Sequence, residues 1–265
     1  GQAMRKFLKS RNFTDGQMLD AGVLKKSTRG GEPYIFFRDR VMFPVSDRRG
    51  RVVAFGGRVL PEHIRPVKGD YTPAKYINSS DTPLFDKGRM LYGESIARQA
   101  VREGHTILVT EGYMDVIACH KYGFKGAVAP MGTALTDDQI LSLFSMVTDD
   151  DKMPILCFDG DNAGRKAAGR ACENILPLLK PGRTVKFAFL PDGEDPDSLL
   201  RGSGAAGFKK FLGASLSLFD FMWASHTAGR RFDEPEARAG LSKALYGQIG
   251  KIADQDIQRH YKELV

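Results

Sequence analysis

Cysteine is scarce in this chain of 265 residues, which holds three cysteines and no Cys-x-x-Cys spacing. An odd number without paired spacing argues against a disulfide framework and against a zinc ribbon, so we expect no zinc. The cysteines lie among apolar residues, which predicts buried, reduced thiols in a cytoplasmic protein, at Cys119, Cys157 and Cys172. Three histidines have no ligand residue near them in the sequence, and we interpret them as structural: His105, His120 and His226.

Long apolar runs are missing as well. No stretch approaches the roughly 18 apolar residues of a membrane span, and the first residues lack the apolar region of a secretion signal. We therefore expect no membrane partner. With 42% hydrophobic and 27% charged residues, the composition excludes a disordered, collagen-like or coiled-coil chain. Residues 1–3, ahead of Met4, resemble a cloning remnant, so we expect a piece of a longer protein.

Acidic side chains are few in the first part of the chain. Residues 1–103 contain 20 Lys and Arg against 11 Asp and Glu, a net charge of +9, whereas residues 104–265 contain 19 and 21, a net charge of −2. Lys and Arg release counterions when they bind phosphates, so the basic part suggests a polyanionic partner. A solvated basic surface without a partner is equally compatible with the charge alone.

The basic part has the pattern of short strands and loops. Two β-rich runs within residues 33–60 flank the turn residues 47–50, which predicts a hairpin with arginines at its tip and along one side. Residues 61–90 are rich in Pro, Gly, Asn, Ser and Asp, and we predict a long extended loop. A loop of that length in a compact chain usually has a function.

From residue 94 onward, predicted helices alternate with predicted strands. The strands cover residues 106–110, 126–129, 154–158 and 184–190, and the helices cover 94–104, 112–122, 134–147 and 161–179. This alternation implies an α/β fold with a parallel sheet and helices on both faces. The last part is predicted to be helical, and we interpret its aromatic residues as packing. We expect three subdomains: a basic mixed α+β one (1–103), an α/β one (104–201) and a helical one (202–265).

Acidic residues follow three of the predicted strands. Glu111 follows the first strand, Asp159 and Asp161 follow the third, and Asp195 and Asp197 follow the fourth. Ligands of open parallel sheets bind at the carboxyl ends of the strands, so we expect these five carboxylates to converge. Converging carboxylates repel one another unless a cation neutralises them, and oxygen ligands suit Mg²⁺ or Mn²⁺. Two such ions, about 4 Å apart, would support phosphoryl transfer.

Each acidic motif also has a simpler interpretation. Asp161 could cap the following helix, and residues 195–197 could form an ordinary turn. Residues 159–164 resemble the start of an EF-hand loop, but Ala163 and Arg170 stand where that loop needs ligands, so we reject an EF-hand. The motifs together, in this order of strands, favour a site.

The same motifs resemble those of a known superfamily. Glu111–Val116, Asp159–Gly164 and Glu194–Asp197 look like the acidic motifs of a TOPRIM domain. The flanking segments narrow the resemblance to the RNA polymerase domain of bacterial DnaG-type replicative primases, over nearly the whole chain. These segments are Arg40–Pro44, Gly50–Arg58, Lys75–Ser79 and Leu84–Gly93. The resemblance implies a TOPRIM-type central parallel sheet over residues 104–201.

The resemblance also implies roles for individual residues. The enzymes of this family make RNA primers on single-stranded DNA from nucleoside triphosphates (NTPs) with divalent metal. By position, the metal-binding acids would be Glu111, Asp159, Asp161, Asp195 and Asp197, with Glu111, Asp159 and Asp161 catalytic. Nucleotide-binding residues would be Lys75, Tyr76, Asn78, Lys87 and Asp115. Tyr76 beside Lys75 also suits the stacking of single-stranded DNA, although a tyrosine packed beneath a loop is the alternative. Arginines would extend this DNA-binding surface at Arg48, Arg51 and Arg58, although an exposed hairpin tip explains the first equally well.

Complete primases of this family carry a zinc-binding module and a helicase-binding module, and neither is recognisable here. We therefore expect a monomeric core at the replication fork that binds the DNA template, NTPs and the RNA–DNA product, and reaches the replicative helicase only through an absent module. Two other classes stay open. One is strand cleavage by a topoisomerase or nuclease, and the other is a non-catalytic module that binds single strands or nucleotides. Metal-dependent formation of primers, cleaved strands or no product separates the three.

Overall fold

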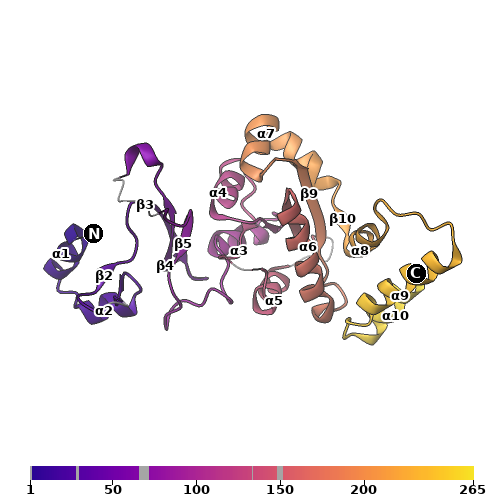
Figure 1. Ribbon diagram of the computed structural model, residues 1–265, viewed down its shortest axis with the longest axis horizontal. Coiled ribbons are helices and arrows are strands. Elements are labelled where there is room, and N and C mark those ends of the chain that lie inside the picture. Colours follow the sequence, from indigo (N-terminus) through magenta and orange to yellow (C-terminus); the bar gives the residue numbers. More distant parts are fainter. Residues whose placement is uncertain (1, 28–29, 66–71, 133, 148–151) are drawn as a thin grey trace. The chain divides into compact units, whose positions relative to one another are not determined.

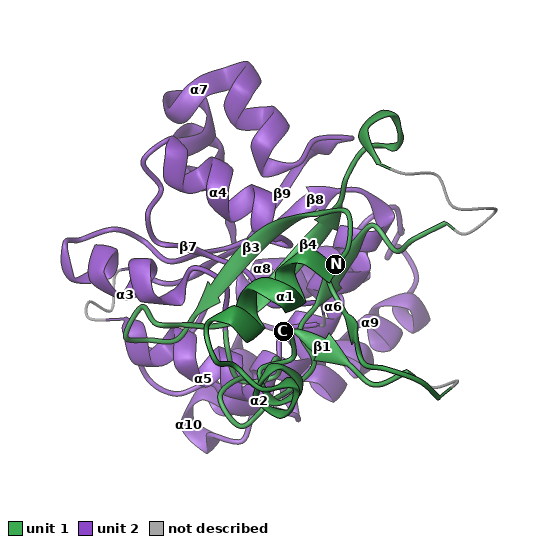
Figure 2. Cartoon of the chain, turned by 90° about the vertical axis from the view of Figure 1, so that its left-hand side faces the viewer, with its two compact units in different colours: residues 1–90 green, residues 91–265 purple. Residues whose placement is uncertain are grey.

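The computed structural model describes residues 2–27, 30–65, 72–132, 134–147 and 152–265 (Figure 1). The chain forms two compact units, Gly1–Met90 and Leu91–Val265, which Figure 2 shows in different colours. The boundary precedes helix α3 (Glu94–Arg102), whereas the sequence suggested one after Glu103. Helix α3 belongs to the second unit because Ala97 and Val101 are buried in that unit's core.

The first unit begins with a small helical layer on two short strands. The elements are α1 (Gln2–Ser10), α2 (Asp15–Asp20), β1 (Leu24–Lys25) and β2 (Tyr34–Ile35), and the two strands pair antiparallel. Thr14 caps α2 through a reciprocal pair with Gln17, in which its hydroxyl accepts from the Gln17 backbone amide. Met18, Leu24 and Ile35 form the buried core of this layer.

An antiparallel sheet completes the first unit, in the strand order β3 (Arg40–Ser46), β4 (Val52–Val59) and β5 (Tyr76–Asn78). The predicted hairpin is confirmed: the backbone amide of Gly50 donates to Asp47 at the turn, and Gly50 has a φ of 80°, which favours glycine. The predicted loop 61–90 is partly wrong, because it contains η1 (Glu62–Ile64) and β5. Strand β5 forms by pairing with β4, a long-range contact that local composition does not reveal. Residues 66–71 of that loop lie outside the described residues.

The second unit is built on a five-stranded sheet in the order β10-β9-β8-β6-β7, surrounded by helices (Figure 1). The four predicted strands are confirmed with shifted ends, and they run parallel. Strand β10 was not predicted and pairs antiparallel with β9 at the edge. The bounds are β6 (Leu108–Val109), β7 (Ala127–Val128), β8 (Ile155–Gly160), β9 (Lys186–Asp192) and β10 (Leu216–Ser217).

Helices cover both faces of this sheet, as the sequence predicts. Successive residues of β8 point to opposite faces, so Leu156 and Phe158 join one core cluster while Cys157 joins the other. The first cluster packs under α3, α5, α6, α8 and α9, and the second under α4 and α7. The bounds are α4 (Tyr113–Lys121), α5 (Asp137–Met146), α6 (Asn162–Ile175), η2 (Leu176–Leu178), α7 (Pro196–Gly213), α8 (Leu218–Thr227), α9 (Pro235–Ile249) and α10 (Gln255–Glu263).

The aromatic residues of the last part act in packing, as expected. Phe221 stacks on Phe187 of β9 with ring centroids 4.2 Å apart, and Phe219 contacts Tyr261 of α10 edge-on. Trp223 differs, because 39% of it is exposed. The cysteines are buried and unpaired, and burial raises the pKa of the Cys119 thiol to about 12. Among the described residues, no helix has the length and apolarity needed to cross a bilayer.

Candidate metal and nucleotide site

The carboxyl ends of three parallel strands bring the predicted acids of the second unit to one edge. Glu111 lies just beyond β6, Asp159 lies within β8, and Asp195 lies between β9 and α7, directly before the helix. The backbone amide of Asp159 donates to Glu111 Oε1 over 3.1 Å, which joins the ends of β6 and β8. The Gly160 amide donates to the Glu194 carbonyl over 3.3 Å, which joins the ends of β8 and β9.

Two of the acids also begin helices. Asp161 Oδ1 accepts from the Gly164 amide over 2.7 Å at the start of α6, and Asp195 Oδ1 accepts from the Ser198 amide over 2.7 Å at the start of α7. The simpler interpretation of Asp161 as a cap is therefore correct, but it does not exclude a ligand role, because each carboxylate keeps a second oxygen. The positive ends of both helix dipoles also offset part of the negative charge here.

Asp159 is the least stabilised of these carboxylates. Its Oδ1 atom is buried and has no hydrogen-bond partner in the described part of the structure. Burial, followed by the nearby charges of Glu111, Asp195 and Asp161, raises the pKa of Asp159 to about 7. A buried, unpartnered anionic oxygen destabilises the folded chain, so a bound cation or a proton would stabilise Asp159.

Asp115 lies deeper in the same charge cluster. It is 9% exposed, and its Oδ2 accepts from the Gly112 amide over 3.0 Å at the start of α4. Burial and then the charge of Asp159 raise the pKa of Asp115 to about 7, and the Gly112 bond opposes that rise. Asp115 therefore adds negative potential behind Asp159.

Asp197 has a different environment from the other acids. Its Oδ2 pairs with the Arg201 guanidinium one turn along α7, over 3.0 Å. Part of its charge is thus already compensated. Sequence reasoning did not single out two other polar contacts at this edge: Glu194 accepts from the Ser198 hydroxyl, and Arg165 pairs with Asp192 over 3.5 Å. Both pairs belong to the quoted acidic motifs or directly adjoin them, which is the only signal that the sequence offers.

The acids do not form a closed cage. Among the described residues, no three His, Cys, Asp or Glu side chains are gathered closely enough to be a ready-made metal site. The donor set nevertheless fits a hard cation, because it consists of carboxylate oxygens and includes the unpartnered Asp159 Oδ1. A magnesium or manganese ion would relieve the repulsion that raises the pKa of Asp159.

Two glycines hold the strand end between Asp159 and Asp161 against its neighbours. A Cβ atom on Gly160 would lie 1.9 Å from the Pro191 carbonyl oxygen of β9, and one on Gly164 would lie 2.3 Å from the Asp159 carbonyl oxygen. Neither position has room for a side chain. The close approach fixes the spacing at which the two aspartates leave β8.

The predicted nucleotide-binding residues of the first unit cluster around β5. Arg58 on β4 lies opposite Tyr76, with its guanidinium 5.8 Å from the ring centroid, and the Lys75 ammonium lies 6.0 Å from the same ring. Tyr76 is 37% exposed, so it is not packed beneath a loop. Asn78 stands opposite Gly56 in the same sheet. The structure thus brings Arg58, Lys75 and Tyr76 together, and we call them the β5 cluster.

The remaining basic candidates of the first unit lie in two other places. Arg51 is held at the hairpin turn by Asp47, with a shortest distance of 2.7 Å, so its charge is already paired. Arg48 occupies the exposed tip of that turn. The backbone amide of Lys87 donates to Asp81. The pKa of Lys25 is lowered, first by the burial of Lys25 and second by the nearby charge of the Lys87 ammonium. No motif in the sequence points to Lys25, whose ammonium lies 3.6 Å from the Phe36 ring centroid.

Comparison with known proteins shows the domain that the second unit contains and the family of the whole chain. Residues 105–189 match the family model described as the Toprim domain, so the predicted TOPRIM-type α/β fold is correct. Residues 1–98 match the model described as the DNA primase catalytic core, N-terminal domain. A crystal structure of a DNA primase domain from Pseudomonas aeruginosa is 42% identical, with a TM-score of 0.84 over 94% of this chain and 74% of that one. The chain therefore belongs to the family of bacterial DnaG-type DNA primases.

Other relatives agree with this assignment. The DNA primase of Pseudomonas aeruginosa is 52% identical over 192 residues, which are 72% of this chain and 27% of the relative. The DNA primase of Escherichia coli strain K12 is 42% identical over 246 residues, or 93% of this chain and 40% of the relative. A DnaG primase catalytic domain bound to ssDNA is 41% identical, with a TM-score of 0.79 over 94% of this chain and 76% of that one. This chain thus spans between about a quarter and two fifths of these curated relatives.

Proposed function

We propose that this chain is the catalytic core of a primase that makes short RNA primers on single-stranded DNA by metal-dependent nucleotidyl transfer from NTPs. The observation that carries the proposal is the unpartnered, buried Asp159 Oδ1 among carboxylates at the carboxyl edge of the sheet. In a chain of the primase family, such a site suits phosphoryl chemistry, in which negative charge must be neutralised.

Glu111, Asp159, Asp161 and Asp195 would hold Mg²⁺ or Mn²⁺, with Asp197 as a further ligand once it leaves Arg201. The metal, when bound, neutralises charge on the phosphates and on the attacking and leaving oxygens. The chain itself contributes orientation: the caps at Asp161 and Asp195 fix the two carboxylates, and the close approach at Gly160 holds the end of β8 against β9. Glu111, with its Oε1 already accepting from Asp159, would act as ligand or general base.

The β5 cluster would bind the template or the incoming nucleotide. An exposed tyrosine ring flanked by Arg58 and Lys75 offers stacking to a base and positive charge to phosphates, a combination used in single-strand binding. Asn78 and Lys87 would add contacts to the nucleotide, and Arg48 would extend the positive surface, whereas Arg51 is engaged by Asp47. A related catalytic domain is bound to ssDNA, which supports single-stranded DNA as the partner of this chain.

The biological setting of the proposal follows from the family. We place the chain in the bacterial cytoplasm at the replication fork, acting as a monomer on single-stranded template and releasing an RNA–DNA product. Strand cleavage and simple nucleotide binding are the outcomes that would replace this proposal.

A primer-synthesis assay tests the proposal directly. The protein is incubated with single-stranded DNA, labelled NTPs and Mg²⁺ or Mn²⁺, with and without a supplied RNA primer. Short RNA made only with metal, and lost in Asp159→Asn, is the expected result. Lys243→Ala is a control because it removes an exposed charge on α9, away from the carboxylates. Cleaved DNA, or no extension of a supplied primer at any metal concentration, would contradict the proposal.

A further inference from the structure

The second unit contains a cavity at the edge of its sheet opposite to the carboxylates. The cavity has a volume of about 620 Å³, and its lining includes Leu108, Ile155 and Lys186, which begin strands β6, β8 and β9. Glu111, Asp159 and Asp195 lie at the other ends of these strands. Along β8, the lining residue Ile155 and Asp159 are separated by roughly 13 Å, at about 3.3 Å per residue. The cavity is therefore a separate place from the proposed catalytic site.

Its lining is positively charged. Lys152, Lys186 and Lys209 line the cavity, and no acidic residue is among the described residues that line it. This is unusual for residues 104–265, whose net charge is −2. The carboxyl ends of three helices (α3, α4 and α7) also meet the cavity and contribute partial negative charge, about −0.5 each. The charges of Lys186 and Lys209 alone exceed that sum, so the described lining offers positive charge to an anion.

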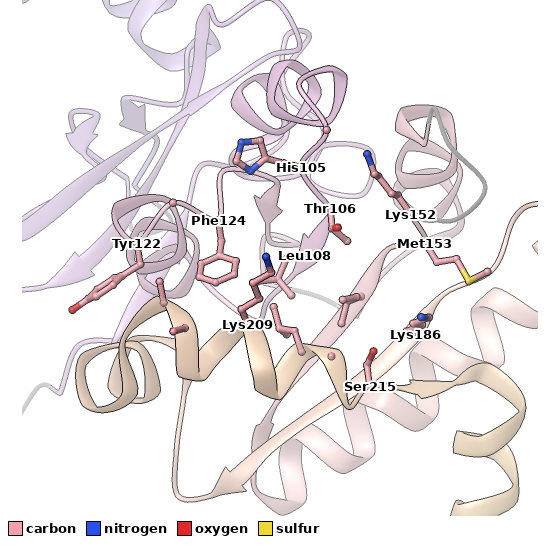
Figure 3. A pocket seen from close by; sticks show the side chains of 17 residues that line it. His105, Thr106, Leu108, Tyr122, Phe124, Lys152, Met153, Lys186, Lys209 and Ser215 are labelled. Atoms are coloured by element: carbon pink, nitrogen blue, oxygen red, sulfur yellow. The ribbon is translucent and has the colours of Figure 1, made fainter.

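The opposite end of the lining is aromatic. Figure 3 shows Tyr122 and Phe124 at one end of the cavity, Lys152 and Lys186 at the other, and Lys209 between them. Phe124 is held by an edge-on contact with the buried Phe208 of α7, at a centroid distance of 5.0 Å. The cavity thus combines a fixed ring and apolar surface with charged groups, and its volume is in the range of small-molecule sites.

We propose that this cavity binds a nucleoside phosphate, with its base at the Tyr122 and Phe124 end and its phosphates at the lysines. The cavity and a nucleoside phosphate correspond in shape and in charge. A nucleoside mono- or diphosphate carries two or three negative charges beside a flat ring, which corresponds to the three lysines beside the two aromatic side chains. Such a site goes beyond primer synthesis, because it lies away from the carboxylates and needs no metal.

Methyl NMR of the whole chain in EDTA provides the test, since chelation removes metal-dependent binding at the carboxylates. Met153 lines the cavity, and the buried Met131 does not, so labelled methionine methyls report on both. Addition of ADP should shift the Met153 signal with a dissociation constant below about 1 mM, and leave Met131 unchanged. Adenosine and pyrophosphate, which each carry half of the ligand, should each bind at least about tenfold more weakly.

Matched variants locate the binding. Lys209→Ala and Lys186→Ala should weaken ADP binding about tenfold, since each removes a charge contact. Lys210→Ala is the control, because Lys210 follows Lys209 on α7 but does not line the cavity. Ala206→Trp should abolish binding by filling the space, and it is tolerable because Ala206 is exposed. The melting temperature of each variant verifies folding.

Four results would overturn the proposal. ADP that leaves Met153 unshifted up to about 5 mM means that the cavity takes no nucleotide. Equal weakening by Lys210→Ala, or pyrophosphate binding as tight as ADP binding, means a general attraction of anions to the surface. Loss of the ADP response in Asp159→Asn means that the nucleotide sits at the carboxylates instead. The last result would leave primer synthesis as proposed, so the two proposals fail separately.

Discussion

Replacing Asp159 by Asn is expected to stabilise the metal-free protein while removing its response to metal. In the folded chain, burial and the neighbouring carboxylates raise the pKa of Asp159 from 3.8 to about 7. A carboxylate with a raised pKa opposes folding wherever it is ionised. Asparagine has nearly the same shape and no charge, so it removes this opposition.

The size of the effect follows from the shift in pKa. A rise from 3.8 to about 7 corresponds to about 4 kcal/mol at 1.36 kcal/mol per unit. Asp159 is only partly buried, so solvent screening reduces the expected gain to about 1–2 kcal/mol. For a unit of this size, that gain raises the melting temperature by about 2–8 °C.

The pH dependence has a definite sign. Below about pH 4 Asp159 is protonated in both the folded and the unfolded chain, so Asp159→Asn should change nothing. The gain in stability should grow as the pH rises from 4 to 7, because in this range Asp159 is ionised in the unfolded chain but still largely protonated in the folded chain. Above pH 7 Asp159 is ionised in both, so the gain should stay constant.

Thermal unfolding in EDTA and in Mg²⁺, from pH 4 to pH 8.5, provides the measurement. Asp161→Asn is the matched control: Asp161 is exposed, Asn keeps the cap of α6, and the charge of Asp161 is the smallest of those that raise the pKa of Asp159. Its stability in EDTA should therefore stay within about 0.5 kcal/mol of the parent. The parent should gain stability with Mg²⁺, and Asp159→Asn should gain much less. An Asp159→Asn protein that is less stable than the parent at pH 8 in EDTA would refute the reasoning.

Substitutions at three further positions test other parts of the structure. Lys75→Ala should weaken the binding of single-stranded DNA and reduce the slope of log K against log salt by about 0.7, because one phosphate contact is lost; an unchanged slope in a salt titration would remove Lys75 from the interface. Asp195→Ala should lower the free energy of unfolding by about 1 kcal/mol, because it removes the cap of α7. Asp195→Asn keeps the cap and should lower the pKa of Asp159, because it removes a neighbouring charge. Denaturant unfolding measures the first effect and carboxyl NMR titration the second, and equal stability of the two variants would contradict the cap. Gly160→Ala should lower the free energy of unfolding by about 3 kcal/mol, because its Cβ would meet the Pro191 carbonyl. A melting temperature within 1–2 °C of the parent corresponds to a loss of only about 0.5 kcal/mol, and it would show that β8 and β9 separate easily.

The strands of the parallel sheet and their direction could be predicted, because the sequence patterns that indicate them are local. Apolar runs such as Ile155–Phe158 alternate with amphipathic helices, and the connection rules for parallel strands then place Glu111, Asp159 and Asp195 at one edge. The hairpin at Asp47 has an equally local signal in its turn residues. These features needed no knowledge of distant contacts.

The unpredicted features all depend on contacts between distant residues. Strands β5 and β10 are short, and each is defined by the strand it pairs with rather than by its own sequence. The unpartnered oxygen of Asp159 depends on burial and on the distances to three other carboxylates. The pairing of Arg51 with Asp47 competes with a role in binding DNA, and composition cannot decide between them. The lysine-lined cavity is assembled from separate segments, none of which carries a motif.

The close packing at Gly160 also limits how this site can evolve. Because the backbone of β9 occupies the space of any side chain there, the residue between the two aspartates is determined by the fold and carries no information about substrate or metal. Selection for a new activity can therefore vary the carboxylates on either side but has one choice at Gly160. In a mutational library of this edge, Gly160 should stay glycine even among variants that have lost catalysis and retain only a folded chain.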